Sequence, residues 1–256
     1  MIAPALIVNG TIYSYNIGNS HYNWLSNVID DARNNGIPWV VVGMHKNCIT
    51  VATKTCEIGS DLMNLFLSKK VDLVLQGHDH VYERSKQLNC TTINSYNPSC
   101  VSDDGADGVY AKGNGSVLII SGAFGQSLYD INTADSEAGY FAKWMGNNIN
   151  PTYGFVKFYV NASALSGEFV RSVGGTFSYN FSIVNASAFA SINVTSPSVA
   201  YSFDAGSGAI LVDESGNGNT GTITESTWIT GKYNGGLQFD GINDRIDISN
   251  SASLDI

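Results

Sequence analysis

Apolar positions in the first third of the chain repeat with two different periods. Residues 21–35 carry apolar side chains at helical spacing and end at Gly36, a common helix terminator. Residues 38–44 (PWVVVGM) form a continuous apolar run, as expected of a strand buried on both faces. Residues 61–70 repeat the helical pattern, and residues 71–76 (VDLVLQ) repeat the apolar run. The order helix, strand, helix, strand predicts an α/β layer. The apolar face of the first helix is predicted to consist of Trp24, Leu25, Val28, Ile29 and Ala32.

Beyond residue 82 the pattern changes to short strand-like segments separated by Gly-rich turns. These segments are residues 117–121, 153–160, 166–171 and 176–184. Residues 185–198 are small, polar and uncharged, which is typical of a linker. From residue 199 onward, Gly, Asn and Asp punctuate short apolar runs. We therefore predict a first domain over residues 1–184, a linker over 185–198 and a second, all-β domain over 199–256.

Composition and charge narrow the range of partners. The chain has 256 residues, of which 43% are hydrophobic, enough for a core. Only 14% are charged, against about 25% in typical soluble domains. The net charge of −9 argues against nucleic acid and anionic membranes, because both require clustered Lys and Arg. No apolar run approaches the length of a membrane span.

The four cysteines lie in two close pairs, Cys48 with Cys56 and Cys90 with Cys100. Neither pair has the spacing of a zinc knuckle or a redox motif, so we favour two short-loop disulfides. Four cysteines allow three connectivities, and four free thiols in a cytosolic protein are the alternative. Glycosylation sequons point instead to a secreted or cell-surface protein. Examples begin at Asn89, Asn161, Asn185 and Asn193.

Neither end of the sequence looks like the terminus of a complete gene product. The first residues (MIAPALIV) lack the basic region of a signal peptide, and their apolar stretch is too short for one. The last residues stop within a strand-like pattern. We therefore expect a fragment truncated at both ends, with any signal peptide outside it.

Three of the four histidines follow the two predicted buried strands. His45 comes after PWVVVGM, and His78 and His80 come after VDLVLQ and Gly77. The carboxyl ends of strands in an α/β sheet form the usual ligand crevice, and residues at i and i+2 face the same way. Neutral imidazole ligates zinc, iron and manganese, so these three are candidate metal ligands. The alternative is ordinary polar loop residues. His21, at the start of a helix, is expected to be exposed.

Residues 77–84 (GHDHVYER) resemble the G-H-x-H-x-Y-E-R box of the calcineurin-like metallophosphoesterases, in the purple acid phosphatase branch. The likeness extends to residues 22–25, 39–46, 109–113 and 117–122. It covers roughly residues 10–184 in all. The resemblance implies a partial metallophosphoesterase sandwich of the α/β (α+β) class. It also implies hydrolysis of phosphate monoesters by two metal ions (Fe, Zn or Mn) that activate water.

Carried over residue by residue, the resemblance assigns His45 and His78 to one metal ion and His80 to the other. Asp79 is expected either to support these ligands or to face solvent. The following Tyr82, Glu83 and Arg84 are expected to hold the loop, with the Glu-Arg neighbours forming a surface pair.

The chain departs from the family pattern in what it lacks. The D-x-H box, the G-D box with its bridging Asp, and the G-N-H box with its catalytic His do not occur. No catalytic residue is therefore assigned. Three histidines without the bridging carboxylate are expected to hold at most one ion, weakly. We predict that the parent protein is a phosphatase and that these residues alone are nearly inactive.

The C-terminal part resembles the start of a laminin-G-like, concanavalin-type jelly roll. The similar segments are residues 199–204, 213–219, 231–233 and 237–241. The resemblance implies glycan or calcium binding. Its Asp and Asn residues could coordinate calcium, or could simply form turns. The alternative function is accordingly a non-catalytic, secreted glycan-binding or adhesion protein on a degenerate phosphoesterase scaffold.

Overall fold

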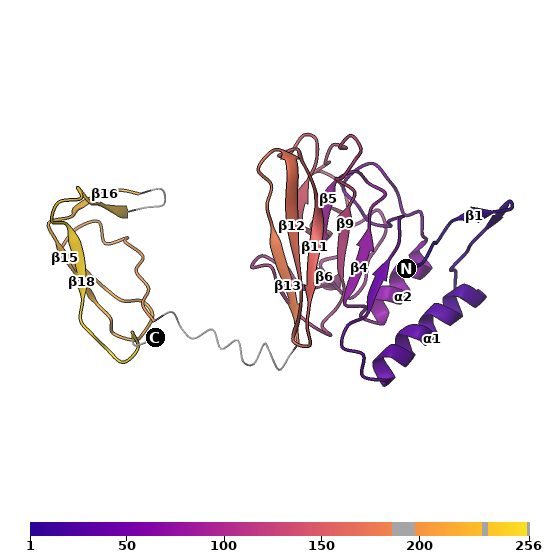
Figure 1. Ribbon diagram of the computed structural model, residues 1–256, viewed down its shortest axis with the longest axis horizontal. Helices are drawn as coiled ribbons and strands as arrows, with labels where there is room; N and C mark the ends of the chain where they lie inside the picture. Colours follow the sequence, from indigo (N-terminus) through magenta and orange to yellow (C-terminus); the bar gives the residue numbers. More distant parts are fainter. Residues whose placement is uncertain (186–197, 232–234, 255–256) are drawn as a thin grey trace. The chain divides into compact units, whose positions relative to one another are not determined.

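The chain divides into two compact units, Met1–Ala190 and Ser191–Ile256. The computed structural model describes residues 1–185, 198–231 and 235–254. In the first unit two β-sheets lie side by side, and two helices cover the outer face of one of them (Figure 1). Within the described ranges, no helix is both long and apolar enough to cross a membrane.

The central sheet of the first unit has five strands in the order β10-β5-β9-β4-β3. Its strands are β3 (Val41–Gly43), β4 (Leu73–Gln76), β5 (Tyr82–Ser85), β9 (Val117–Ser121) and β10 (Phe141–Met145). Strands β3, β4 and β9 are parallel, and β5 pairs antiparallel with both β9 and β10. Helix α1 (Ser20–Asn34) precedes β3, and α2 (Ser60–Ser68) connects β3 to β4. The predicted α/β layer is therefore confirmed.

A second sheet, with the order β11-β12-β13-β8, packs on the inner face of the central sheet. Its strands are β8 (Val109–Ala111), β11 (Thr152–Val160), β12 (Ala164–Gly174) and β13 (Asn180–Val184). Successive residues of a strand point to opposite faces, so the inner strand β4 of the central sheet contributes to two cores. Leu73 packs with Phe169 and Phe181 of the second sheet, whereas Val74 belongs to the cluster that contains Phe66 of α2.

The edge of the central sheet is more open than the sequence suggests. Val41 of β3 is 42% exposed, so the expectation of a strand buried on both faces is wrong here, because β3 has a neighbour on one side only. On α1, Leu25 and Ile29 are buried, but Trp24 (54% exposed) and Val28 (42% exposed) are not. The apolar face of the helix is thus only half covered by the described residues.

The structure pairs the cysteines locally, as two disulfides, Cys48–Cys56 and Cys90–Cys100. Among the three connectivities, this is the one with the shortest loops. The described chain holds no free cysteine. Two short loops of the first unit are therefore covalently closed.

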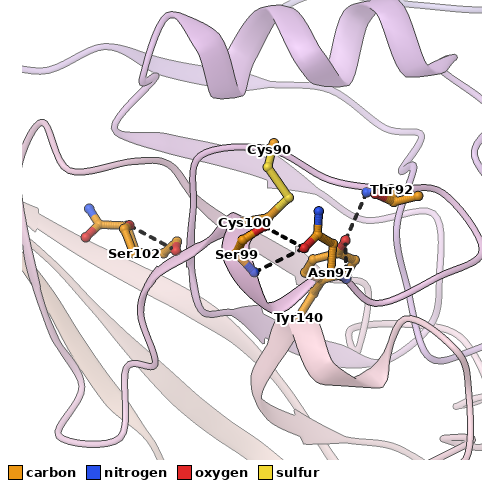
Figure 2. Close-up of a disulfide and its surroundings, with 8 residues drawn as sticks. Cys90, Thr92, Asn97, Ser99, Cys100, Ser102 and Tyr140 are labelled. Atoms are coloured by element: carbon orange, nitrogen blue, oxygen red, sulfur yellow. Dashed lines mark hydrogen bonds between the residues drawn. A yellow bond between two sulfur atoms is a disulfide. The ribbon is translucent and has the colours of Figure 1, made fainter.

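The Cys90–Cys100 loop also encloses a buried tyrosine hydroxyl (Figure 2). The Tyr140 hydroxyl accepts hydrogen bonds from the backbone N–H of Thr92 (2.9 Å) and of Asn97 (3.0 Å). The disulfide and this tyrosine together fix both sides of the loop. The remaining short elements of this unit are β1 (Ile7–Val8), β2 (Thr11–Ile12), β6 (Gln87–Leu88), β7 (Val101–Asp103) and the 3₁₀ turns Pro98–Cys100 and Ala138–Tyr140.

The second unit contains only small sheets in its described part. Strands β14 (Ile210–Leu211), β15 (Gly221–Thr224) and β18 (Arg245–Ile248) form one sheet, and β16 (Thr227–Thr230) and β17 (Gly235–Gln238) form a hairpin. These strands agree with an all-β unit, while a jelly roll remains a prediction. Most of the predicted linker, residues 186–197, lies outside the described residues.

Candidate metal centre

The parallel pairing of β3 and β4 brings His45 and His78 together. His45 and His78 each follow the carboxyl end of their strand by two residues. The backbone ladder continues past the strands, because Gly77 N–H donates to the His45 carbonyl at 3.0 Å. As a result His78 Nδ1 lies 2.6 Å from His45 Nε2, and the two rings meet edge to face at 4.6 Å. The two imidazoles thus converge on one point at the ligand-binding edge of the sheet.

The other nitrogen of His78 faces a carboxylate that the sequence did not reveal. Glu57 Oε2 lies 3.2 Å from His78 Nε2, and Glu57 Oε1 accepts from Lys46 Nζ at 3.2 Å. Burial lowers the pKa of the His78 imidazole, and the Glu57 charge opposes that shift. Glu57 belongs to no motif. Its position directly after Cys56, where the loop closed by the Cys48–Cys56 disulfide ends, is the only sequence signal for it.

His80 turns to different partners. Its Nδ1 lies 3.1 Å from the Ser127 carbonyl oxygen, and its ring stacks on Tyr129 with 4.3 Å between centroids. The described residues contain no group of three or more His, Cys, Asp or Glu side chains that could hold a metal ion. The three candidate ligands are therefore not assembled as one cluster in this structure.

His45 and His78 fit a metal ion as a pair but do not complete its site. Two nitrogens on a tetrahedral zinc, each about 2.0–2.1 Å away, stand about 3.3 Å apart. The observed 2.6 Å is instead an imidazole–imidazole hydrogen bond. The rings would have to separate by less than about an ångström to admit an ion. A third ligand is missing from the described residues.

Asp79, between the two box histidines, is fully buried, so the expectation that it might face solvent is wrong. Its carboxylate accepts backbone N–H groups of Thr53 (3.2 Å) and Lys54 (3.1 Å). It also accepts from the Asn47 side-chain amide at 3.3 Å. Asp79 thereby anchors the segment 47–54, which leads away from His45.

Two more buried carboxylates hold the same segment. Glu83 accepts from the Thr50 hydroxyl and from the Val51 N–H, both at 3.1 Å. Glu137 accepts from the Thr50 N–H at 3.2 Å. Burial raises the pKa of Glu83 well above its ordinary value, and the nearby Asp79 charge adds to the shift. The segment 47–54 is thus fixed by carboxylates inside the protein.

Arg84 is also fully buried, so the predicted Glu-Arg surface pair is wrong. Successive residues of β5 point to opposite faces, which separates Glu83 from Arg84. The Arg84 guanidinium lies 4.4 Å from the Tyr179 ring centre. Its Nη2 donates to the Gly105 carbonyl (3.0 Å) and the Tyr179 hydroxyl (2.9 Å). Aromatic faces take the place of an acidic partner.

His21 is half-buried rather than exposed. Its Nδ1 lies 3.2 Å from the Ser14 carbonyl oxygen, and its ring stacks on Tyr13 at 4.9 Å. These contacts tie the start of α1 to the preceding segment. His21 has no described contact with the other three histidines.

In the second unit, Asp213 organises a turn. Its carboxylate accepts the backbone N–H groups of Ala200 (3.0 Å), Ser215 (2.9 Å) and Asn219 (2.8 Å). This is the turn-forming behaviour that was the alternative to calcium binding. Calcium has no support among the described residues.

Comparisons with known proteins converge on one enzyme family. The chain is 29% identical over 116 residues to Fe(3+)-Zn(2+) purple acid phosphatase 12 of Arabidopsis thaliana, covering 43% of this chain and 25% of the relative. It is 28% identical over 119 residues to a purple acid phosphatase of Glycine max, covering 44% and 26%. The chain thus spans about a quarter of the curated relatives it matches. No protein-family model matches it.

A solved structure shows the same fold. Purple acid phosphatase PPD1 from yellow lupin (Lupinus luteus) seeds superposes with a TM-score of 0.52 at 20% identity. The match covers 67% of this chain and 29% of that one. Together the comparisons support a calcineurin-like metallophosphoesterase, as the GHDHVYER box predicted. They do not favour the glycan-binding alternative, and they do not show the laminin-G-like segment.

Proposed function

We propose that the first unit carries the histidine side of a metal-dependent phosphoesterase centre. The observation that carries the proposal is the convergence of His45 Nε2 and His78 Nδ1 at the ends of adjacent parallel strands. Paired imidazole nitrogens at this edge suit zinc, iron or manganese. The similarity to purple acid phosphatases, one of them named for iron and zinc, supports this assignment.

Enzymes of this kind use metal ions to activate water and to neutralise charge on the phosphoryl group. In our proposal His45 and His78 hold one ion, and His80 serves a second after leaving Ser127 and Tyr129. The described residues contain no bridging carboxylate beside these histidines. The hydrolytic step therefore belongs to a centre that this chain supplies only in part.

The proposed substrates are phosphate monoesters. The net charge of −9 disfavours long polyanions, so small esters fit best. The two disulfides support export of the protein. For the second unit, the laminin-G-like assignment and a glycan ligand remain proposals that rest on the sequence resemblance alone.

The proposal is tested by titrating zinc into the chain and following the heat of binding. We expect at most one ion to bind, weakly. Replacing His45→Ala or His78→Ala should each weaken binding at least about tenfold, because each removes a direct ligand. His21→Ala is the matched control, since that histidine lies outside the site, and it should leave binding unchanged. Unchanged affinity in both His45→Ala and His78→Ala would overturn the proposal.

A further inference from the structure

A cavity of about 510 Å³ lies at the end of the central sheet opposite the histidines. Asp72 lines it and directly precedes β4, whereas His78 follows the other end of the same strand. The cavity walls come from four separate stretches of the chain. Its charged lining residues are Arg33, Lys69, Lys70, Asp72 and Lys112.

The charge of this cavity contrasts with that of the whole chain. Four of the 13 Lys and Arg residues line it, in a protein whose net charge is −9. The one carboxylate in the lining, Asp72, is already engaged, because its Oδ2 lies 3.0 Å from Arg33 Nη2 and accepts the Val40 N–H at 2.8 Å. Lys69 pairs with Asp30. Among the described residues, neither Lys70 nor Lys112 has a carboxylate at ion-pair distance.

Arg33 and Lys112 are held in place by fixed parts of the fold. Arg33 Nη2 donates to the Lys70 carbonyl at 2.9 Å, which joins the end of α1 to the segment after α2. The Lys112 ammonium lies 4.8 Å from the Trp39 ring centre. The Lys112 backbone N–H donates to Val184 at 2.8 Å. A site whose charges are already positioned costs little ordering when a ligand binds.

Helix ends explain only part of this arrangement. Arg33 lies in the last turn of α1 and Lys69 caps α2, where cations offset the negative end of the helix dipole. Lys112 follows β8 and caps no helix, yet it faces the same cavity. Its convergence with Lys70 is therefore not accounted for by helix capping.

We propose that this cavity binds a small, soluble, multiply charged oxyanion of the diphosphate type. Its volume falls in the range of small-molecule sites, about 300–1,000 Å³, and exceeds what one phosphate group needs. Lys70 and Lys112 are the unpaired cations that would contact the anion, and Arg33 presents a planar fork suited to phosphate. The site is separate from the histidines and does not depend on the proposed phosphoesterase function.

The test is calorimetric titration of inorganic pyrophosphate into the whole chain, at low ionic strength and with a chelator present to exclude metals. We expect saturable binding to one site. The double variant Lys70→Asn/Lys112→Gln should bind at least about tenfold more weakly, since charged hydrogen bonds are lost. Asn is chosen for position 70 because Lys70 has φ +49°, a conformation that Asn tolerates.

The control variant Lys86→Gln/Lys157→Gln removes the same charge from two lysines outside the cavity, each over a tyrosine ring as Lys112 lies over the Trp39 ring. It should change affinity by less than about twofold. Thermal melts with and without pyrophosphate provide a second measure, because a ligand of the folded state raises the Tm. Absence of binding to the wild-type chain, or equal weakening in both double variants, would overturn the proposal. His45→Ala should leave pyrophosphate binding unchanged, which separates this outcome from that of the zinc titration.

Discussion

Glu83 is the second acidic residue of the GHDHVYER box, and its surroundings differ from those of a surface carboxylate. It is fully buried, and its Oε2 has no hydrogen-bond partner in the described structure. Its other oxygen holds Thr50 and Val51. Burial of this kind disfavours the charged form, so a proton on Glu83 stabilises the folded protein.

Replacing Glu83→Gln should therefore change how stability depends on pH. The pKa of Glu83 is raised in the folded protein. The contribution of the wild-type carboxyl to the free energy of unfolding is therefore fully present below pH 4.5, the ordinary pKa of Glu, and is lost as the pH rises through the folded pKa. Relative to the variant, the free energy of unfolding of the wild type should fall by up to about 1.4 kcal/mol per pH unit in that window. Urea denaturation at a series of pH values from 5 to 8 measures it.

The matched control is Asp31→Asn on the exposed side of α1. This change removes a carboxylate of the same charge from the surface. Its effect on the free energy of unfolding should stay within about 0.5 kcal/mol across the same pH range. A wild-type protein that keeps a constant stability relative to Glu83→Gln would contradict the inferred shift.

Arg84 stabilises the fold through stacking and two hydrogen bonds rather than an ion pair. Arg84→Lys should lower the free energy of unfolding by about 2–4 kcal/mol, because the flat guanidinium and its donors to Gly105 are lost. Tyr179→Phe keeps the ring and removes only the hydroxyl, so it should cost about 1 kcal/mol. Equal costs of the two changes, measured by urea denaturation, would show that neither the stacking nor the hydrogen bond to Gly105 adds stability.

At the scale of elements, the sequence predicted the parts that depend on local pattern. The apolar runs before His45 and His78 locate β3 and β4, and parallel pairing then follows from the helix between them. The partners of Asp79, Glu83 and Arg84 could not be predicted in this way. Those partners lie 21 to 95 residues away in the chain and share no periodicity with the box.

Glu57 illustrates the same limit. It reaches His78 only because the Cys48–Cys56 disulfide and the carboxylates around segment 47–54 fold that loop back toward β4. Nothing in its own sequence neighbourhood indicates a histidine partner. Exposure of β3 was mispredicted for a related reason, since a hydrophobic run does not reveal whether its strand lies at a sheet edge.

The segment 47–54 should loosen when its main anchor is removed. In Asp79→Ala the N–H groups of Thr53 and Lys54 lose their acceptor, at a cost of about 1–3 kcal/mol in local stability. Amide hydrogen exchange should then be faster at both residues, while the amides of β9 keep their protection. Unchanged exchange at Thr53 and Lys54 would show that the disulfide, Glu83 and Glu137 hold the segment without Asp79.

At the scale of the whole molecule, the described residues bring His45 and His78 together but assemble no group of three or more metal-ligating side chains around them. The chain should therefore be nearly inactive toward a small phosphate monoester such as p-nitrophenyl phosphate, even with zinc, iron or manganese added. The missing charge neutralisation and water activation account for several orders of magnitude in rate. Robust turnover that disappears in His78→Ala would contradict this prediction and show that the chain completes its own centre.

The central claim is that His45 and His78 are a metal-ligand pair, and nuclear magnetic resonance of the histidine side chains tests it most directly. Long-range ¹H–¹⁵N spectra report each imidazole nitrogen separately during a zinc titration. We predict that the signals of His45 Nε2 and His78 Nδ1 shift together and first, because these atoms already face each other at 2.6 Å. The His21 signals should not move. Zinc that shifts His21 equally, or leaves the His45 and His78 nitrogens unaffected, would contradict the account.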